Sequence, residues 1–152
     1  MLATFDPENV IFTINDYQLT DFALGEFITL RLDAPKFRKV SGIRGKNTRV
    51  HTRDRSGTVS FRMLQTSNQN NILSQITNSD DFNLSNKLMV NIVDVGGGTG
   101  IQVGNAYLES VPNISFSSDT TPNDWVINFE YITRYDVGGN QKGALDFIGN
   151  LF

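Results

Sequence analysis

Residues 58–76, TVSFRMLQTSNQNNILSQI, decide the fold because a strand pattern runs directly into a helix pattern here. In the first half, Val59, Phe61 and Met63 point to one side, and the residues between them point to the other. This period of two is typical of a strand with one buried face. The stretch therefore predicts a strand-then-helix unit around which the other apolar runs assemble.

The helix is predicted to begin at the capping-box pattern formed by Thr66 and Gln69. Ile72, Leu73 and Ile76 then share one face, and the residues around them are mostly polar. A helix of about three turns is not stable alone in water, because its nucleation is costly. We therefore expect these three side chains to form the core by which the helix docks on a sheet.

Other runs alternate in the same way and predict further strands. They cover residues 8–14, 27–33, 87–95, 101–110 and 125–135, with shorter pieces at 17–19 and 113–117. In the run 125–135, the predicted buried face holds Trp125, Ile127, Phe129 and Tyr131. The glycine-rich residues 96–100 predict a hairpin loop, because the Lys-[Ser/Thr] pair and the helix of a phosphate-binding loop are absent.

The predicted fold is mainly β with one α-helix. It is an antiparallel β-sandwich or partly closed barrel of roughly six or seven strands, with the helix on one face or edge. A chain of 152 residues fits a single domain spanning 1–152, and the absence of cysteine excludes disulfides and thiolate metal sites. The first residues lack a signal-peptide pattern, and no apolar run is long enough to span a bilayer.

Charge is unevenly distributed along the chain. Residues 31–55 hold nine of the 13 basic residues and only two acids, a net charge of +7, whereas the residues before Arg31 hold five acids and no base. Residues 34–56 also contain Gly42 and Gly45 and few large apolar side chains, so we expect a long, exposed basic loop. Such segregation of charge favours a partner of opposite sign.

Three interpretations of the basic loop remain open: a nucleic-acid site, a contact with an acidic protein surface, or a solvated loop without a partner. Nucleic-acid binding usually adds aromatic side chains for stacking, and between residues 36 and 56 the only aromatic of that kind is Phe37. His51 is the only histidine of the chain, which excludes a site built from several histidines. The sequence gives no case for an enzyme and predicts no catalytic residue, cofactor or metal.

The order of these elements resembles the tail tube protein of contractile-tailed bacteriophages. The resemblance rests on two N-terminal strands, a long loop, the unit TVSFRMLQTSNQNNILSQI, a glycine-rich hairpin and a late strand containing NFEYIT. Its most particular feature is the polar run at 65–71 followed by Ile72 and Leu73. The same order is similar to the Hcp tube protein of type VI secretion and to the tubes of R-type pyocins.

The resemblance implies a structural virion protein that has no enzymatic activity. Members of this family form hexameric rings whose sheets join edge to edge into a continuous barrel, and the rings stack into a hollow tube that conducts DNA. The implied partners are other copies of the chain, the tail sheath protein, and the tape-measure protein and passing DNA in the lumen, with no membrane anchoring. The implied location is the virion tail, with assembly in the host cytoplasm.

In this family the long loop reaches the neighbouring ring, and the termini help the rings to stack. We therefore expect basic residues of the loop to face acids of the next ring. The bases are Arg38, Lys39, Arg44, Lys46, Arg49, Arg53 and Arg55, and the first candidate acids are Asp6, Glu8, Asp16 and Asp21. The apolar tail 144–152 is expected to dock as well, and the lumen face is expected to be polar or acidic.

Two alternatives accompany this interpretation. One is an Hcp-like tube of a secretion or bacteriocin system, which has the same fold. The other is a small β-barrel nucleic-acid-binding protein, with the basic loop as its binding site.

Overall fold

The computed structural model describes residues 2–84 and 87–139, so the apolar tail predicted at 144–152 lies outside the described residues. A 3-10 turn, Pro7–Asn9, precedes the first strand. The strands are β1 (Val10–Ile14), β2 (Tyr17–Leu19), β3 (Ile28–Leu32), β4 (Phe37–Ser41), β5 (Asn47–His51), β6 (Gly57–Met63), β7 (Leu88–Asp94), β8 (Gly100–Leu108) and β9 (Asn123–Asp136). The helix α1 (Gln69–Asn83) lies between β6 and β7.

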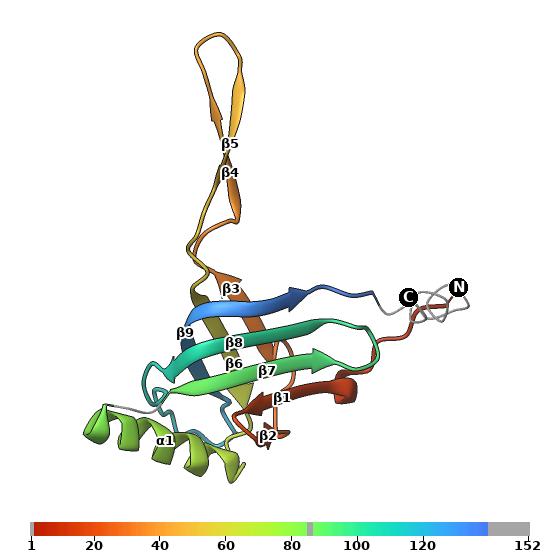
Figure 1. The fold of residues 1–152 in the computed structure, drawn as a ribbon. Coiled ribbons are helices and arrows are strands. Elements are labelled where there is room, and N and C mark those ends of the chain that lie inside the picture. Colours follow the sequence, from red (N-terminus) through yellow and green to blue (C-terminus); the bar gives the residue numbers. More distant parts are fainter. Residues whose placement is uncertain (1, 85–86, 140–152) are drawn as a thin grey trace.

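Seven of these strands form one antiparallel sheet in the order β2-β1-β7-β8-β9-β6-β3. The sheet curls into a half-barrel, while β4 and β5 form a separate two-stranded ribbon that projects from the body (Figure 1). This arrangement confirms the predicted mainly-β, partly closed barrel with one helix. The described residues contain nine strands, and the extra ones arise because the basic loop itself folds into a ribbon.

The core lies on the inner side of the curled sheet. Val59, Phe61 and Met63 of β6 are each at most 1% exposed, as the alternation predicted, and β6 lies between β3 and β9. Trp125 and Ile127 of β9 pack into the same cluster. The residues between the buried ones of β6, namely Thr58, Ser60 and Arg62, are polar and lie on the opposite face.

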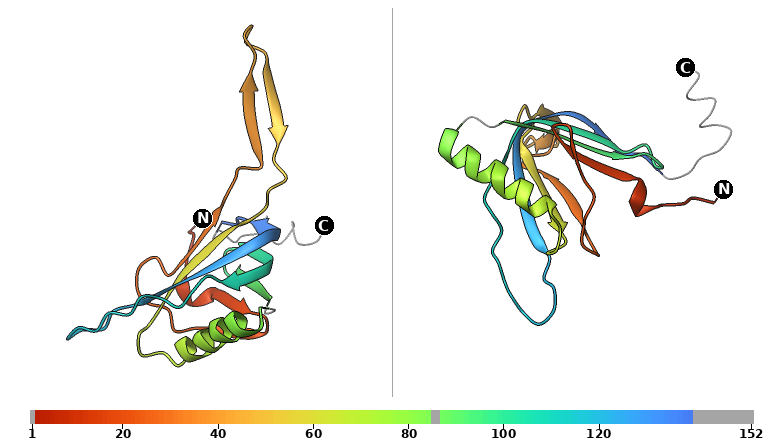
Figure 2. Two further views of the ribbon diagram at one scale, coloured as in Figure 1. Left: turned by 90° about the vertical axis from the view of Figure 1, so that its left-hand side faces the viewer. Right: turned by 90° about the horizontal axis from the view of Figure 1, so that it is seen from below.

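The helix covers one end of the half-barrel (Figure 2). Leu73 is 1% exposed and Ile76 packs partly against the core, whereas Ile72 is only partly buried. The predicted capping box is wrong, because the helix begins at Gln69 with Asn68 as its N-cap, and the Asn68 side chain makes no capping hydrogen bond.

The buried face of β9 changes partway along the strand. Trp125, Ile127 and Phe129 are buried as predicted, but Tyr131 is 38% exposed and Ile132 is buried instead. On the neighbouring strand β8, Gly104 pairs with Tyr131, and a Cβ atom added to Gly104 would lie 2.5 Å from Tyr131 Oη. The prediction for Tyr131 is therefore wrong, because its ring lies over a glycine on the outer face.

The predicted short strand at 113–117 is also wrong. These residues belong to an irregular connection, 109–122, between β8 and β9. The glycine-rich residues 96–100 do lie at the β7–β8 turn, where Asp94 N donates to Thr99 O at 2.9 Å. Among the described residues, no helix combines the length and the apolar character that crossing a membrane requires.

Candidate assembly surfaces

The basic loop is a folded hairpin rather than an irregular segment. Phe37 pairs with His51 at its base and Ser41 pairs with Asn47 near its tip. The tip is closed by a 2.7 Å hydrogen bond from Gly42 N to Lys46 O, and Gly45 has a φ of +87°, which favours glycine. A signal in the sequence could have indicated this ribbon, since two five-residue runs flank a turn with two glycines.

The two faces of the ribbon differ in chemistry, because side chains alternate across a strand. One face holds Phe37, Lys39, Arg49 and His51. On this face the Arg49 guanidinium carbon lies 4.5 Å from the centre of the Phe37 ring, and the Phe37 and His51 rings are 5.2 Å apart. An exposed cation–π contact of this kind contributes about 0.5–1 kcal/mol, so it favours this arrangement of Arg49 over Phe37.

The ribbon is tied to the sheet at Ser56. Asp33 N donates to Ser56 O at 3.0 Å, and the Ser56 hydroxyl lies 2.8 Å from Asp33 Oδ2 and 2.7 Å from Asp54 Oδ1. The Ser56 hydroxyl and the Ser56 N–H both donate to Asp54, and these bonds lower the pKa of its carboxyl group. The only two acids of the basic segment are therefore engaged at its base.

All seven basic residues proposed from the sequence are exposed. Arg38 and Lys39 lie on β4 and Arg49 on β5, Arg44 and Lys46 lie at or beside the tip, and Arg53 and Arg55 lie on the return to β6. The ion pairs among the described residues are Arg62–Asp124 at 2.9 Å and Arg134–Asp136 at 2.7 Å, and neither includes a residue of the ribbon. The positive charge of the ribbon is thus not neutralised by salt bridges within the described part of the subunit.

The candidate acids do not gather beside the ribbon. Asp6 accepts from Glu8 N at 3.0 Å ahead of β1, and Asp21 accepts from the Ser67 hydroxyl at 2.7 Å. Asp16 is exposed in the turn between β1 and β2, which lies at the end of the body away from the ribbon (Figure 1). The subunit therefore carries a basic projection at one end and an acid at the other.

The two edges of the main sheet are protected unequally. Along β2, Gln69 Oε1 accepts from Thr20 N at 2.9 Å and from Asp21 N at 3.0 Å, while Gln69 Nε2 donates to Gln18 O at 3.3 Å. The sequence assigned Gln69 to its own helix and missed this role. The side chain covers part of an edge that would otherwise expose unpaired backbone groups.

The other edge, β3, is open. Phe27 O accepts from Arg62 N at 2.9 Å and Asp33 N donates to Ser56 O, so these residues bond toward β6. Because backbone groups alternate in an antiparallel strand, those of Ile28, Leu30 and Leu32 point to the opposite side. No strand pairs with β3 on that side among the described residues.

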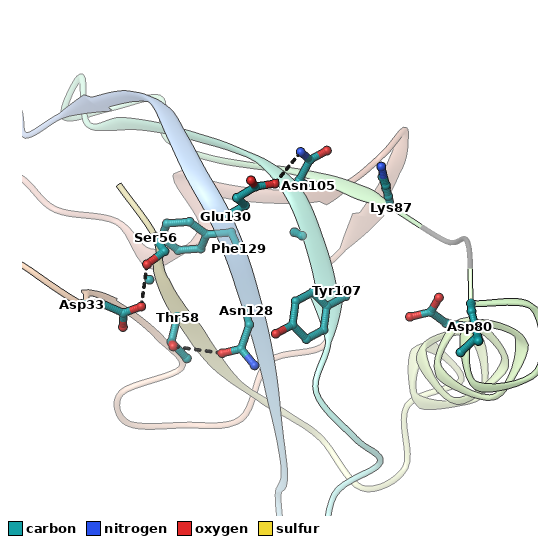
Figure 3. Close-up of a pocket in the computed structure, with 13 residues that line it drawn as sticks. Asp33, Ser56, Thr58, Asp80, Lys87, Asn105, Tyr107, Asn128, Phe129 and Glu130 are labelled. Atoms are coloured by element: carbon teal, nitrogen blue, oxygen red, sulfur yellow. Dashed lines mark hydrogen bonds between the residues drawn. The ribbon is translucent and has the colours of Figure 1, made fainter. Parts of the chain in front are cut away.

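A polar cavity of about 770 Å³ lies between the outer face of β6, β8 and β9 and the end of α1 (Figure 3). Thr58 Oγ1 donates to Asn128 Oδ1 at 3.1 Å, and Asn105 Nδ2 donates to Glu130 Oε2 at 2.8 Å. These cross-strand bonds pair the polar groups with one another. The lining is a polar sheet surface, and the Ser56 hydroxyl within it donates to the Asp33 carboxylate at 2.8 Å.

No protein-family model matches the chain. It is similar to the structural protein ORF10 of Pseudomonas phage KPP10, with 26% identity over 148 residues that cover 92% of this chain and 85% of that protein.

Three solved structures share the fold. A chain of the sheath–tube complex of an extracellular contractile injection system, PVC, in its extended state superposes with a TM-score of 0.61, 14% identity, and coverage of 88% of this chain and 92% of that one. The anti-feeding prophage cap, which terminates the AFP tube, gives 0.58 at 12% identity, over 91% of this chain and 94% of that one. The sheath/tube terminator of PVC superposes with a TM-score of 0.55 at 14% identity, over 85% of this chain and 94% of that one. The predicted resemblance to contractile-tail tube proteins is thereby confirmed in the fold.

Proposed function

We propose that the chain is the tube-forming structural protein of a contractile phage tail. Hexameric rings of it stack into the inner tube, which forms the conduit for DNA ejection. The observation that carries the proposal is the basic ribbon, which projects from a half-barrel of the tube type and has no salt bridge to the described part of its own subunit. The fold shared with contractile injection systems and the similarity to a phage structural protein support it.

The placement of charge supports the proposed stacking. In the proposed tube the ribbon of one ring contacts acids of the next ring, and Asp6, Glu8, Asp16 and Asp21 are the candidate partners. Such a contact joins two different surfaces, so it adds rings in one direction without closing. Each exposed ion pair contributes only about 0–1 kcal/mol, but ring symmetry repeats every pair around the contact.

The same proposal includes the partners that the tube has besides its own copies. The tube lies inside a sheath protein and holds a tape-measure protein and then DNA, in a virion assembled in the host cytoplasm. A lumen that conducts DNA must avoid strong binding to phosphates. The polar sheet face with Thr58, Asn128 and Glu130 suits that requirement, because it carries hydrogen-bonding groups and a carboxylate.

A second candidate function is that of a cap that terminates a tube. The similarity to the AFP cap and to the PVC terminator, each covered over 94% of its length, favours it. A cap needs one stacking surface, whereas a tube protein needs two.

Negative-stain microscopy of the purified chain, together with gel filtration, tests both functions. We expect rings at low concentration and tubes many rings long at high concentration. Rings that never stack on one another, but that block the growth of tubes made by another protein, would favour the cap. A monomer at every concentration that shifts oligonucleotides would contradict both and support the nucleic-acid-binding alternative.

A further inference from the structure

The connection 109–122 between β8 and β9 exposes apolar side chains in a way that the fold of one subunit does not explain. Ile114 is 68% exposed and Phe116 is 84% exposed, and Val111 is 46% exposed. Figure 2 shows this blue-green segment leaving the body as a long excursion. Its roots are fixed, since Glu109 N donates to Val126 O at 3.0 Å and Thr121 N donates to Gln65 Oε1 at 2.9 Å.

Between these roots, the backbone of residues 110–117 has no hydrogen-bond partner within the described part of the subunit. None of the N–H groups of residues 110–117 donates a hydrogen bond to another described residue, and no turn is formed within these residues. In an extended chain, Ile114 and Phe116 lie two residues apart and point to the same side. The segment therefore has the two properties of a strand without a sheet: free backbone groups and an apolar face.

The open edge of β3 offers the complementary surface. A groove of about 470 Å³ runs beside this strand, and its apolar lining includes Phe27, Ile28, Leu30, Ile101 and Tyr135. The backbone groups of Ile28, Leu30 and Leu32 point toward the open side. An extended peptide that joins an exposed edge gains main-chain hydrogen bonds, and its alternate side chains fill the groove beside that edge.

We propose that residues 113–116 of one copy add as a strand to β3 of the neighbouring copy, with Ile114 and Phe116 in the groove. The inference rests on the proposed function and names the contact that joins subunits within a ring. The occupant is a second copy because the segment points away from the body that carries its own β3 (Figure 2). The edge of β2 is not the partner, because Gln69 already bonds to its backbone.

The contact joins two different surfaces of the same chain. Each subunit both gives a segment and receives one, so the contact repeats around a closed ring without using the ribbon. Ring closure and ring stacking are thereby assigned to separate parts of the molecule.

Photo-cross-linking tests the contact directly. Phe116 is replaced by benzoylphenylalanine in a mixture of ¹⁴N- and ¹⁵N-labelled chains, and the same replacement at Phe82, an 89% exposed position on α1, is the matched control. We expect mixed-isotope cross-links from position 116 to the peptide that contains residues 27–32, and none to that peptide from position 82. Cross-links from position 116 to its own chain, to β2 or to the ribbon would overturn the proposal.

A substitution pair gives an independent measure. Ile114→Ser with Phe116→Ser should lower the fraction of chains in rings by roughly tenfold or more. The control Phe82→Ser should leave that fraction unchanged. At dilutions at which the chains are monomeric, both variants should melt with wild type, because these side chains are exposed in a single subunit. Rings that form normally from the double variant would overturn this contact and leave the proposed function intact. Wild-type chains that form no rings would instead contradict the proposed function, while the cross-linking would still report on the contact.

Discussion

The indole Nε1 of Trp125 donates a 3.0 Å hydrogen bond to Oδ1 of Asn70. Trp125 is 1% exposed at the centre of the core, and Asn70 lies in the first turn of α1. The Asn70 amide also donates to Leu64 O at 2.7 Å, so one side chain joins β9, α1 and the end of β6. The position of the helix on the half-barrel is therefore fixed by a polar contact as well as by an apolar one.

Removing this contact should destabilise the domain. Asn70→Ala leaves the buried Trp125 N–H without a partner, which should lower the free energy of unfolding by about 1–3 kcal/mol. Chemical denaturation checks this value. Asn71→Ala, at the exposed neighbouring position, is the control and should change stability little. Equal stability of Asn70→Ala and wild type would show that water replaces the amide.

The apolar contact between the helix and the sheet should contribute more to stability than the Asn70–Trp125 hydrogen bond. Leu73→Ala should lower the free energy of unfolding by about 2–5 kcal/mol, because the side chain is buried and its removal leaves a cavity. Thermal melts of Leu73→Ala and Phe82→Ala, an exposed residue of the same helix, separate burial from helix propensity. A Leu73→Ala melt that matches wild type would contradict the docking core proposed for Ile72, Leu73 and Ile76.

Reversing charge on the ribbon should stop stacking without unfolding the domain. Arg44→Glu with Arg49→Glu should leave the melting temperature nearly unchanged. The only expected loss of stability is the roughly 0.5–1 kcal/mol that the Arg49–Phe37 contact contributes. Micrographs should show single rings or short stacks. Added salt should shorten wild-type tubes in the same direction, because it screens exposed charges.

The control for this reversal carries the same change in charge elsewhere. Lys87→Glu with Arg134→Glu alters two exposed bases outside the ribbon and should leave tube length unchanged. Tubes of normal length from the ribbon variant would show that the basic residues do not make the stacking contact.

Gly57, where the ribbon returns to the sheet, should not tolerate a side chain. A Cβ atom there would lie 2.6 Å from Phe129 Cζ, whereas one at Gly139 meets nothing within 4 Å. Gly57→Ala should therefore destabilise the domain by about 1–3 kcal/mol, the usual cost of overpacking, and Gly139→Ala should not. Denaturation midpoints of the two variants, compared with that of wild type, measure this difference in stability.

The anchor at Ser56 should be visible in a titration. Ser56→Ala removes the hydroxyl that lowers the pKa of Asp54, so that pKa should rise toward its ordinary value. A carboxyl with a lowered pKa stabilises the folded ribbon at neutral pH, and this contribution is lost as the pH falls through the folded-state pKa. Carbon-detected NMR of the Asp54 carboxyl measures the change. An unshifted titration in Ser56→Ala would mean that the Ser56 hydroxyl does not hold the carboxylate.

Alternation predicted the strands well because each has one buried face. The positions of Val59, Phe61 and Met63 could be read from the sequence alone, since burial repeats every second residue in a regular strand. Tyr131 failed the same rule because Gly104, on another strand, creates the space for its ring. The alternation along one strand gives no information about which residue lies opposite on the neighbouring strand.

Long-range polar contacts could not be predicted from the sequence either. Gln69 has the residue type and spacing of a helix cap, yet it bonds to the backbone of Thr20, 49 residues away. The charge distribution located the basic segment but not its shape, because a solvent-exposed ribbon has no buried face to leave an apolar pattern. The candidate contact residues were identified by charge alone and remain a prediction.

The pairing of β1 with β7 has a consequence for how the protein is made. When β1 leaves the ribosome, only β2 is available to pair with it, and an isolated two-stranded hairpin is marginally stable in water. Phe12 and Ile14 can pair with Ile92 and Val90, which lie opposite them on β7, only after β7 has been synthesised. The half-barrel is therefore completed late in translation, and the apolar N-terminal hairpin depends on the nascent chain staying unaggregated until then.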